Sequence, residues 1–235
     1  METYVINLTR RQDRLQRVTG KFATLGVKLS PFEATDAQSV RFLESGLISR
    51  GLAANWLSHA RLLSEISSGD SDYALIVEDD SEPSRHVDWP LLLASAAIEL
   101  PRNNIDLLQL GFCSWQYKLS TRPGLFEAFR NLLYPSQRTV LSLDTPRTVI
   151  TGSFLAGAHG YIVSRSFANS LSNFNNPPWT GSDGLLMRMS SMSSSDPKYP
   201  KIARLGRSII EQESRRNWKS KIESDVTTTE QPPPI

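Results

Sequence analysis

The sequence is short of cysteine and of long apolar runs, and each shortage excludes a class of protein. Its 235 residues include one cysteine, Cys113, so no internal disulfide can form and a reducing compartment is favoured. The longest apolar run, residues 91–100, contains Glu99 and is too short to span a bilayer. Residues 1–8 lack the basic and apolar regions of a signal peptide. We therefore expect a cytoplasmic protein without an integral membrane segment, and leave open a peripheral association with the cytosolic face of a membrane.

Neither sign of charge is in large excess. The chain has 26 Lys and Arg against 24 Asp and Glu, a net charge of +2, so the overall balance does not point to nucleic acid or an anionic membrane. Its length and ordinary composition predict one globular domain over residues 1–224. Residues 225–235 are polar and end in a run of prolines before Ile235, which predicts a disordered tail.

Apolar spacing predicts strands and helices that alternate through the first half of the chain. Strands are expected over residues 4–8, 27–34, 73–78 and 105–112, and helices over 12–25, 53–66 and 89–100. Residues 9–12 match a capping box at the start of the first helix, and Gly26 is placed to end it.

The second half of the chain is expected to be looser. Residues 113–150 lack periodicity, which in a compact domain is typical of a lid or a binding loop. Short strands are expected over 153–156, 161–164 and 201–205, and helices over 166–171 and 182–192. Together the elements predict an α/β fold with a mostly parallel central sheet flanked by helices and a ligand crevice at one sheet edge.

The stretch from Tyr73 to Asp80 is the most informative in the chain. Five mostly apolar residues end in Glu78, Asp79 and Asp80, as a buried strand does where its carboxyl end meets solvent. Ligands of open α/β sheets bind at that end, and three adjacent acids repel one another unless a cation or proton compensates them. A divalent-metal site and a solvated acidic turn are both compatible with this pattern, and the pattern alone favours the turn.

Six short segments stand in order along residues 3–215. They are Tyr4–Leu8 with Asp13-Arg14, Glu33–Asp36, Leu57–His59, Leu75–Asp80, Gly157–Ser164 and Ser182-Asp183. Together they resemble glycosyltransferase family 25, which includes bacterial lipopolysaccharide galactosyltransferases and collagen galactosyltransferases. One feature of the family differs here, because Ala54-Asn55 replaces the Gly-Cys pair that usually precedes the Ser-His segment. We expect His59 to be structural or to support the site rather than to act in catalysis.

The resemblance implies a GT-A fold and an inverting transfer of a hexose. The donor would be a UDP-sugar, with galactose favoured, and the acceptor a hydroxyl of lipopolysaccharide or another surface glycan. Residues 1–112 would form the donor and metal half, and residues 113–224 the acceptor and base half.

The resemblance also favours a metal site, usually for Mn²⁺, with Mg²⁺ as the alternative. A divalent cation neutralises the charge that grows on a departing nucleoside diphosphate. Asp80 is our first choice as ligand because it lies furthest beyond the strand, followed by Glu78. His159, in a glycine-flanked turn, is either a third metal ligand, a donor to the diphosphate, or a core histidine bonded to backbone. Asp79 is expected to face the donor or solvent.

Two acids are candidates for the general base that takes a proton from the acceptor. The resemblance favours Asp183 as this base. The alternative is that Asp183 is only an acid in the first turn of a helix, where it complements the helix dipole. Glu211 is the second candidate. Trp179 is the aromatic residue we expect to stack on a sugar, unless it is buried in the core.

Four residues near the first strand are candidates for donor contacts. In a GT-A fold this edge of the sheet contacts the nucleotide, so Asn7 would bind the base, and Arg10 or Arg14 would pair with phosphate. A charged, capped helix face explains the arginines equally well. Asp36 would contact the nucleoside, or it only forms an Asx turn.

Two other function classes remain compatible with the sequence. The chain could be a catalytically silent relative that binds a nucleotide sugar or glycan. It could also be a metal-dependent phosphohydrolase that uses the same acidic strand end.

Overall fold

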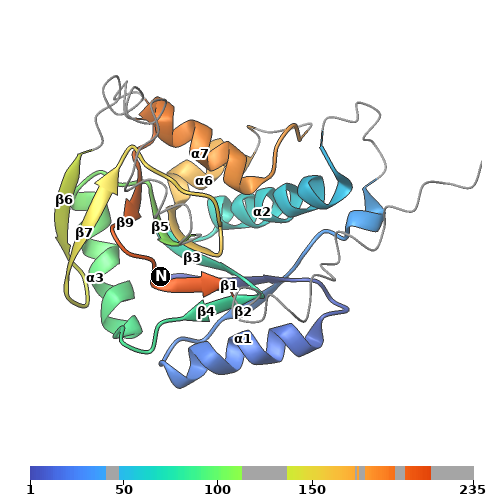
Figure 1. The fold of residues 1–235 in the computed structure, drawn as a ribbon, viewed down its shortest axis with the longest axis horizontal. Helices are drawn as coiled ribbons and strands as arrows, with labels where there is room; N and C mark the ends of the chain where they lie inside the picture. Colours follow the sequence, from blue (N-terminus) through green and yellow to red (C-terminus); the bar gives the residue numbers. More distant parts are fainter. Residues whose placement is uncertain (41–47, 113–136, 173, 175–177, 194–198, 213–235) are drawn as a thin grey trace, which may run out of the picture.

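The computed structural model describes residues 1–40, 48–112, 137–172, 174, 178–193 and 199–212, which form an α/β fold. A mixed sheet lies between helices on both of its faces (Figure 1). The helices are α1 (Gln12–Thr24), η1 (Ala37–Ser39), α2 (Arg50–Ser68), α3 (Trp89–Arg102), α6 (Arg165–Ser172) and α7 (Ser182–Ser193). The strands are β1 (Glu2–Asn7), β2 (Ser30–Glu33), β3 (Tyr73–Glu78), β4 (Ser81–Pro83), β5 (Leu107–Gly111), β6 (Arg138–Ser142), β7 (Pro146–Thr151), β8 (Gly160–Ser164), β9 (Ile202–Leu205) and β10 (Ile210–Gln212).

The strand order is β2-β1-β3-β8-β5-β9-β7-β6, with β10 paired to β4 and β5. β1 runs parallel to β2 and β3, whereas β8 runs antiparallel to both β3 and β5. The expected mostly parallel sheet is therefore wrong, and the sheet is mixed. The chain enters β8 at the edge of the sheet where β3 ends, so β8 runs back along β3. This reversal places the start of β8 beside the end of β3.

The two faces of the sheet carry separate apolar cores because strand side chains alternate. On β3, Leu75 and Val77 pack in the core beneath α1 and α3, where Phe22 and Trp89 meet edge to face. Ala74 and Ile76 point to the other core, which α2, α6 and α7 cover (Figure 1). Both faces of β3 are thus buried, and only its carboxyl end, at Glu78, reaches the surface.

Most predicted elements are confirmed, and α1 shows one error. The end of α1 is as predicted, since Gly26 has φ of +78°, a conformation that glycine adopts easily. The capping box is wrong. Arg11 is the N-cap and makes no side-chain capping hydrogen bond, and the Gln12 amide instead donates to the Thr9 carbonyl.

The second half holds more regular structure than its sequence indicates. Residues 138–151, expected to be part of an irregular loop, include the antiparallel hairpin of β6 and β7. The predicted strand over 153–156 is wrong, and β10 was not predicted. Residues 113–136 and the tail from 225 lie outside the described residues. The domain boundaries remain a prediction, although strands from both halves share one sheet.

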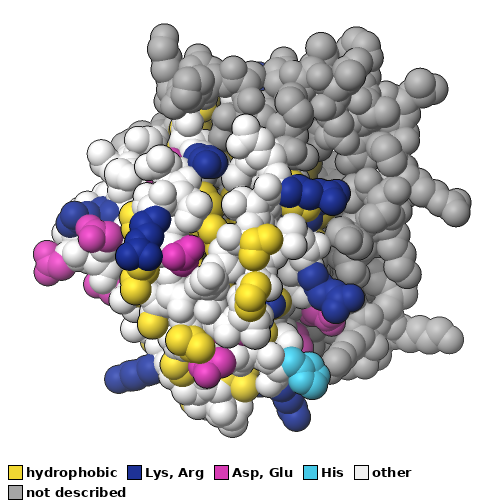
Figure 2. Space-filling model, turned by 90° about the vertical axis from the view of Figure 1, so that its left-hand side faces the viewer, with side chains coloured by type: hydrophobic (Ala, Val, Ile, Leu, Met, Phe, Trp, Pro, Cys, Tyr) yellow, Lys and Arg dark blue, Asp and Glu magenta, His cyan; other side chains and the backbone are white. Residues whose placement is uncertain are grey.

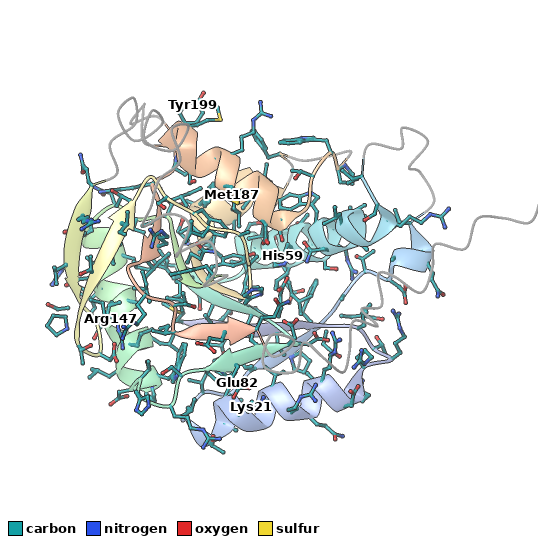
Figure 3. The ribbon with its side chains drawn as sticks, viewed as in Figure 1. Lys21, His59, Glu82, Arg147, Met187 and Tyr199 are labelled. Atoms are coloured by element: carbon teal, nitrogen blue, oxygen red, sulfur yellow. The ribbon has the colours of Figure 1, made fainter. Side chains whose placement is uncertain are left out.

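One side of the molecule has a surface of mixed character. On the side that β6, β7 and α3 occupy, hydrophobic side chains are scattered among charged and polar ones (Figure 2). Figure 3 shows Lys21 of α1 beside Glu82 of β4, and these two side chains form an ion pair that ties the helix to the sheet. None of the described helices is both long and apolar enough to cross a membrane.

Candidate active site

The candidate site lies where β3 ends and β8 begins. The backbone N–H of Glu78 donates to the carbonyl of His159 over 3.2 Å, and the Ser81 hydroxyl donates to the same carbonyl. Residues about 80 positions apart in the chain are therefore joined at one edge of the sheet. The antiparallel insertion of β8 is what produces this contact.

Three side chains gather there in an arrangement that suits a cation. Glu78, Asp80 and His159 each offer a ligand atom, and these atoms all lie within 4.8 Å of one another. Glu78 Oε2 is 3.2 Å from His159 Nδ1. Burial would raise the pKa of Glu78, but the hydrogen bonds and charges of His159 and His59 outweigh it and hold that pKa well below its usual range. Glu78 is accordingly an anion in this setting.

Asp80 contains an unsatisfied oxygen in the same cluster. Its Oδ2 accepts a hydrogen bond from Gln212 Nε2 at 2.9 Å, whereas its Oδ1 is buried and has no hydrogen-bond partner among the described residues. Burial, together with the negative charge of Glu78, raises the pKa of Asp80 to about 6. A buried acceptor without a donor is costly unless a cation or proton satisfies it. Carboxylate oxygens and an imidazole nitrogen are ligands that Mn²⁺ accepts, so the residues present fit a divalent ion.

β10 carries Gln212 to Asp80, and its residue Ile210 lies very close to two glycines. A Cβ on Gly111 would lie 2.9 Å from both the Cβ and the carbonyl oxygen of Ile210, and one on Gly160 would lie 2.3 Å from Ile210 Cδ1. A larger residue at Gly111 would require the β10 backbone to move, whereas one at Gly160 would displace the end of the Ile210 side chain. The glycines therefore permit the strand that carries Gln212 to Asp80.

Helix α2 approaches Glu78 from above the sheet. Asn55 Nδ2 donates to Glu78 Oε1 over 3.1 Å, and His59 Nε2 lies 3.5 Å from the same oxygen. Figure 3 shows His59 between α2 and the strands beneath it. His59 Nδ1 is 2.8 Å from the Tyr161 hydroxyl, and burial and the charge of Glu78 raise the pKa of Tyr161 well above its usual value. A tyrosine that stays protonated can donate to Nδ1, which leaves the ring proton on Nε2, facing the carboxylate.

Asp183 lies in the first turn of α7. Its Oδ2 accepts the backbone N–H of Gly157 at 2.7 Å. Gly157 has φ of +106°, and its carbonyl is held by the buried amide of Gln109 at 2.8 Å. Burial and the negative charge of Glu78 raise the pKa of Asp183 despite the hydrogen bond from Gly157. A carboxylate with a raised pKa accepts a proton more readily than an ordinary one.

The neighbouring acid, Asp79, points to the corner between β1 and α1. Asn7 Nδ2 donates to Asp79 Oδ2 at 2.9 Å, and Arg14 forms an ion pair with Asp79 Oδ1 at 3.3 Å. Burial raises the pKa of Asp79, and Arg14 and Asn7 oppose that rise. Asn7 and Arg14, both expected to contact the donor, thus share Asp79 as a partner.

Arg10 and Asp36, also expected near the donor, form an exposed ion pair. Asp36 Oδ1 accepts the N–H of Gln38 at 2.9 Å, which is the Asx-turn contact considered as the alternative for this residue. Both side chains therefore have structural partners.

Trp179 and Glu211 are both exposed. The Arg188 guanidinium lies 5.2 Å from the centre of the Trp179 ring, so one face of the ring has a cationic neighbour. Glu211 is in register with Glu82 on β4, and its neighbour Gln212 is the β10 residue that contacts Asp80.

A comparison with known protein families identifies the family of the chain. The family model of glycosyltransferase family 25, described as lipopolysaccharide biosynthesis proteins, matches residues 1–185. The chain belongs to glycosyltransferase family 25. Membership in family 25 implies glycosyl transfer between a donor and an acceptor. The match includes Asp80, His159 and Asp183, whereas β10 with Gln212 lies beyond it. No curated protein matches the chain at a significant level.

Proposed function

We propose that the protein is a metal-dependent, inverting glycosyltransferase of GT-A architecture. It transfers a hexose, with galactose favoured, from a UDP-sugar to a hydroxyl of lipopolysaccharide or another glycan. The observation that carries the proposal is the cluster of Glu78, Asp80 and His159 at the end of β3, with its unsatisfied Asp80 oxygen. Family membership supplies the reaction class, and this cluster supplies the reason for a metal.

Asp80 and His159 would hold Mn²⁺ or Mg²⁺ together with Glu78. When bound, the ion supplies positive charge to the diphosphate that leaves the sugar. Asn55 donates to one oxygen of Glu78, which also lies 3.5 Å from His59 Nε2, and His159 contacts the other oxygen, so the carboxylate is oriented from two sides. Gln212 restricts Asp80 in the same way. The side chains are thus positioned by the protein itself, as ligands of a catalytic ion need to be.

Asp183 takes the proton from the acceptor hydroxyl as the new glycosidic bond forms. An inverting transfer needs such a carboxylate on the face of the sugar opposite the leaving group. The hydrogen bond from Gly157 fixes one oxygen of Asp183 and leaves the other for the acceptor. Glu211 is the second candidate for this role.

The donor nucleotide binds along the corner that Asn7, Arg14 and Asp79 form. Arg14 places a cation beside the acidic cluster, since it pairs with Asp79, the residue between Glu78 and Asp80. If Arg14 pairs with the diphosphate, it exchanges its present anionic partner, Asp79, for another anion. Trp179 contributes an exposed ring for the acceptor sugar.

A donor screen tests this proposal. Thermal unfolding is measured with UDP, UDP-galactose, UDP-glucose and GDP-mannose, each with and without Mn²⁺, because a ligand that binds the native state raises the apparent Tm. We expect UDP compounds to raise Tm only with Mn²⁺, and UDP to be released when lipopolysaccharide is added to UDP-galactose. Binding without release would favour a silent sugar-binding relative. Phosphate release from a simple ester without any nucleotide would favour a phosphohydrolase.

A further inference from the structure

Asn55 lies on the face of α2 that is turned toward the candidate site. It stands four positions before His59, so the two side chains share one side of the helix. Its Nδ2 donates to Glu78 Oε1 at 3.1 Å. Its Oδ1 accepts from the Ser182 hydroxyl at 2.7 Å and from the Ser182 backbone N–H at 3.3 Å. One side chain therefore joins the end of β3 to the first residue of α7.

The partners of Asn55 require an amide. The ionised carboxylate of Glu78 only accepts hydrogen bonds, and the backbone N–H of Ser182 only donates one. An amide presents a donor and an acceptor on one planar group, so it satisfies both partners at once. An aspartate at this position would lack the donor, and a leucine would lack both. The orientation of the Asn55 side chain follows from these partners alone.

Close packing brings α7 within reach of this amide. A Cβ on Gly181 would lie 3.1 Å from Leu52 Cδ2 and 3.9 Å from Asn55 Oδ1. The residue before α7 therefore rests directly on α2. Ser182 is buried in this contact, so its N–H and hydroxyl depend on protein partners rather than on water.

We propose that Asn55 is a positioning residue that fixes the acidic end of β3 relative to the first turn of α7. The inference rests on the proposed function, in which Glu78 belongs to the donor side of the site and Asp183 accepts the proton. Ser182 directly precedes Asp183, so the Asn55 bridge controls where that carboxylate stands. Displacing a reacting group by about 1 Å can cost about 100-fold in rate, which gives this bridge a functional consequence.

A double-mutant cycle tests the bridge. Asn55→Leu removes both halves of it, and Ser182→Ala removes the hydroxyl on the α7 side. Turnover is followed as UDP release from UDP-galactose with Mn²⁺ and lipopolysaccharide. We expect Asn55→Leu to lower kcat about 10- to 100-fold and Ser182→Ala to lower kcat by a smaller factor. In both variants the donor KM should stay within about threefold of the wild-type value. Because both act through one link, the double variant should be no slower than Asn55→Leu.

Ser67→Ala, on an exposed part of α2, is the matched control and should leave kcat unchanged. Losses that multiply in the double variant would overturn the proposal. So would an Asn55→Leu variant whose donor KM rises while its kcat is unaffected.

Hydrogen exchange separates this inference from the proposed function. Exchange of the amides of residues 182–186 is compared in the intact wild type, Asn55→Leu, Ser182→Ala and Ser67→Ala. Relative to wild type, we expect about tenfold faster exchange in Asn55→Leu and Ser182→Ala and an unchanged rate in Ser67→Ala. This should hold whether or not the protein turns over. If the wild type releases no UDP but the exchange pattern holds, the proposed function fails and the bridge stands. Unchanged exchange in Asn55→Leu overturns the bridge itself.

Discussion

Gln212 donates to Asp80 across 2.9 Å in space and 132 positions in sequence. This contact restrains one oxygen of the proposed metal ligand and leaves the other unsatisfied. It comes from a strand of three residues that runs beside the end of β5 and pairs with β4. The last described strand of the chain therefore contributes a residue to the site at the end of β3.

Replacing Gln212 should weaken metal binding without removing a ligand. Gln212→Leu deletes the donor to Asp80, so the carboxylate loses its preferred orientation. Loss of such a supporting hydrogen bond typically lowers metal affinity about 10- to 100-fold. Calorimetric titration of Mn²⁺ in the presence of UDP measures this, with Gln16→Leu on the exposed side of α1 as the control. Equal Mn²⁺ affinity in wild type and Gln212→Leu would show that Asp80 does not depend on this contact.

The site illustrates what local sequence can predict. The β3 strand, its buried faces and the three acids at its end follow from a local pattern, and all of them stand in the structure as expected. His159 could be connected with Glu78 only through the family resemblance, because the antiparallel course of β8 has no local signal. Gln212 and Asn55 have no such motif, and each becomes meaningful only through a contact with a distant residue. The mixed sheet was missed for the same reason, since strand direction depends on where the chain enters the sheet.

The Asp183 carboxylate should be needed for turnover but not for donor binding. Asp183→Asn keeps an oxygen that can accept the Gly157 N–H, so the loop should hold its place. It removes the proton acceptor, and loss of a general base costs about 10²- to 10⁴-fold in kcat. Steady-state kinetics should show this fall with little change in donor KM. Near-normal turnover would transfer the role to Glu211, and Glu211→Gln would then be the inactive variant.

The glycines beneath β10 should be intolerant of a methyl group, each for its own reason. Gly111→Ala meets the backbone oxygen of Ile210, whereas Gly160→Ala meets only the end of its side chain. Both should destabilise the fold by about 1–3 kcal/mol, which is the usual effect of overpacking. Ile210→Val removes the atom that meets Gly160→Ala, so it should partly rescue that variant and not Gly111→Ala. Urea unfolding of the singles and doubles measures the coupling, and equal rescue of both would contradict this packing.

The Asp144–Arg147 pair should contribute a pH-dependent part of the stability. Burial would raise the pKa of Asp144, but its hydrogen bonds and charge pairing with Arg147 lower it overall. Because the pKa is lower in the folded state, the stabilisation is present above the unfolded pKa of about 3.9 and is lost as pH falls through the folded value. Asp144→Asn should thus be less stable than wild type at pH 7, and the gap should shrink toward pH 3. Urea midpoints across pH measure it, and a gap that widens in acid would contradict the assignment.

The central claim is that the acidic end of β3 binds the ion that sugar transfer requires. Asp80→Asn and Asp72→Asn change matched acids at opposite ends of this strand, and Asp72 is an exposed partner of Arg165. Titrating Mn²⁺ into each protein with UDP present, beside UDP release from UDP-galactose, tests it directly. We predict that Asp80→Asn binds Mn²⁺ at least about 100-fold more weakly and loses turnover, while Asp72→Asn matches wild type. Wild-type Mn²⁺ affinity in Asp80→Asn, or full turnover by the wild type in excess EDTA, would contradict the claim.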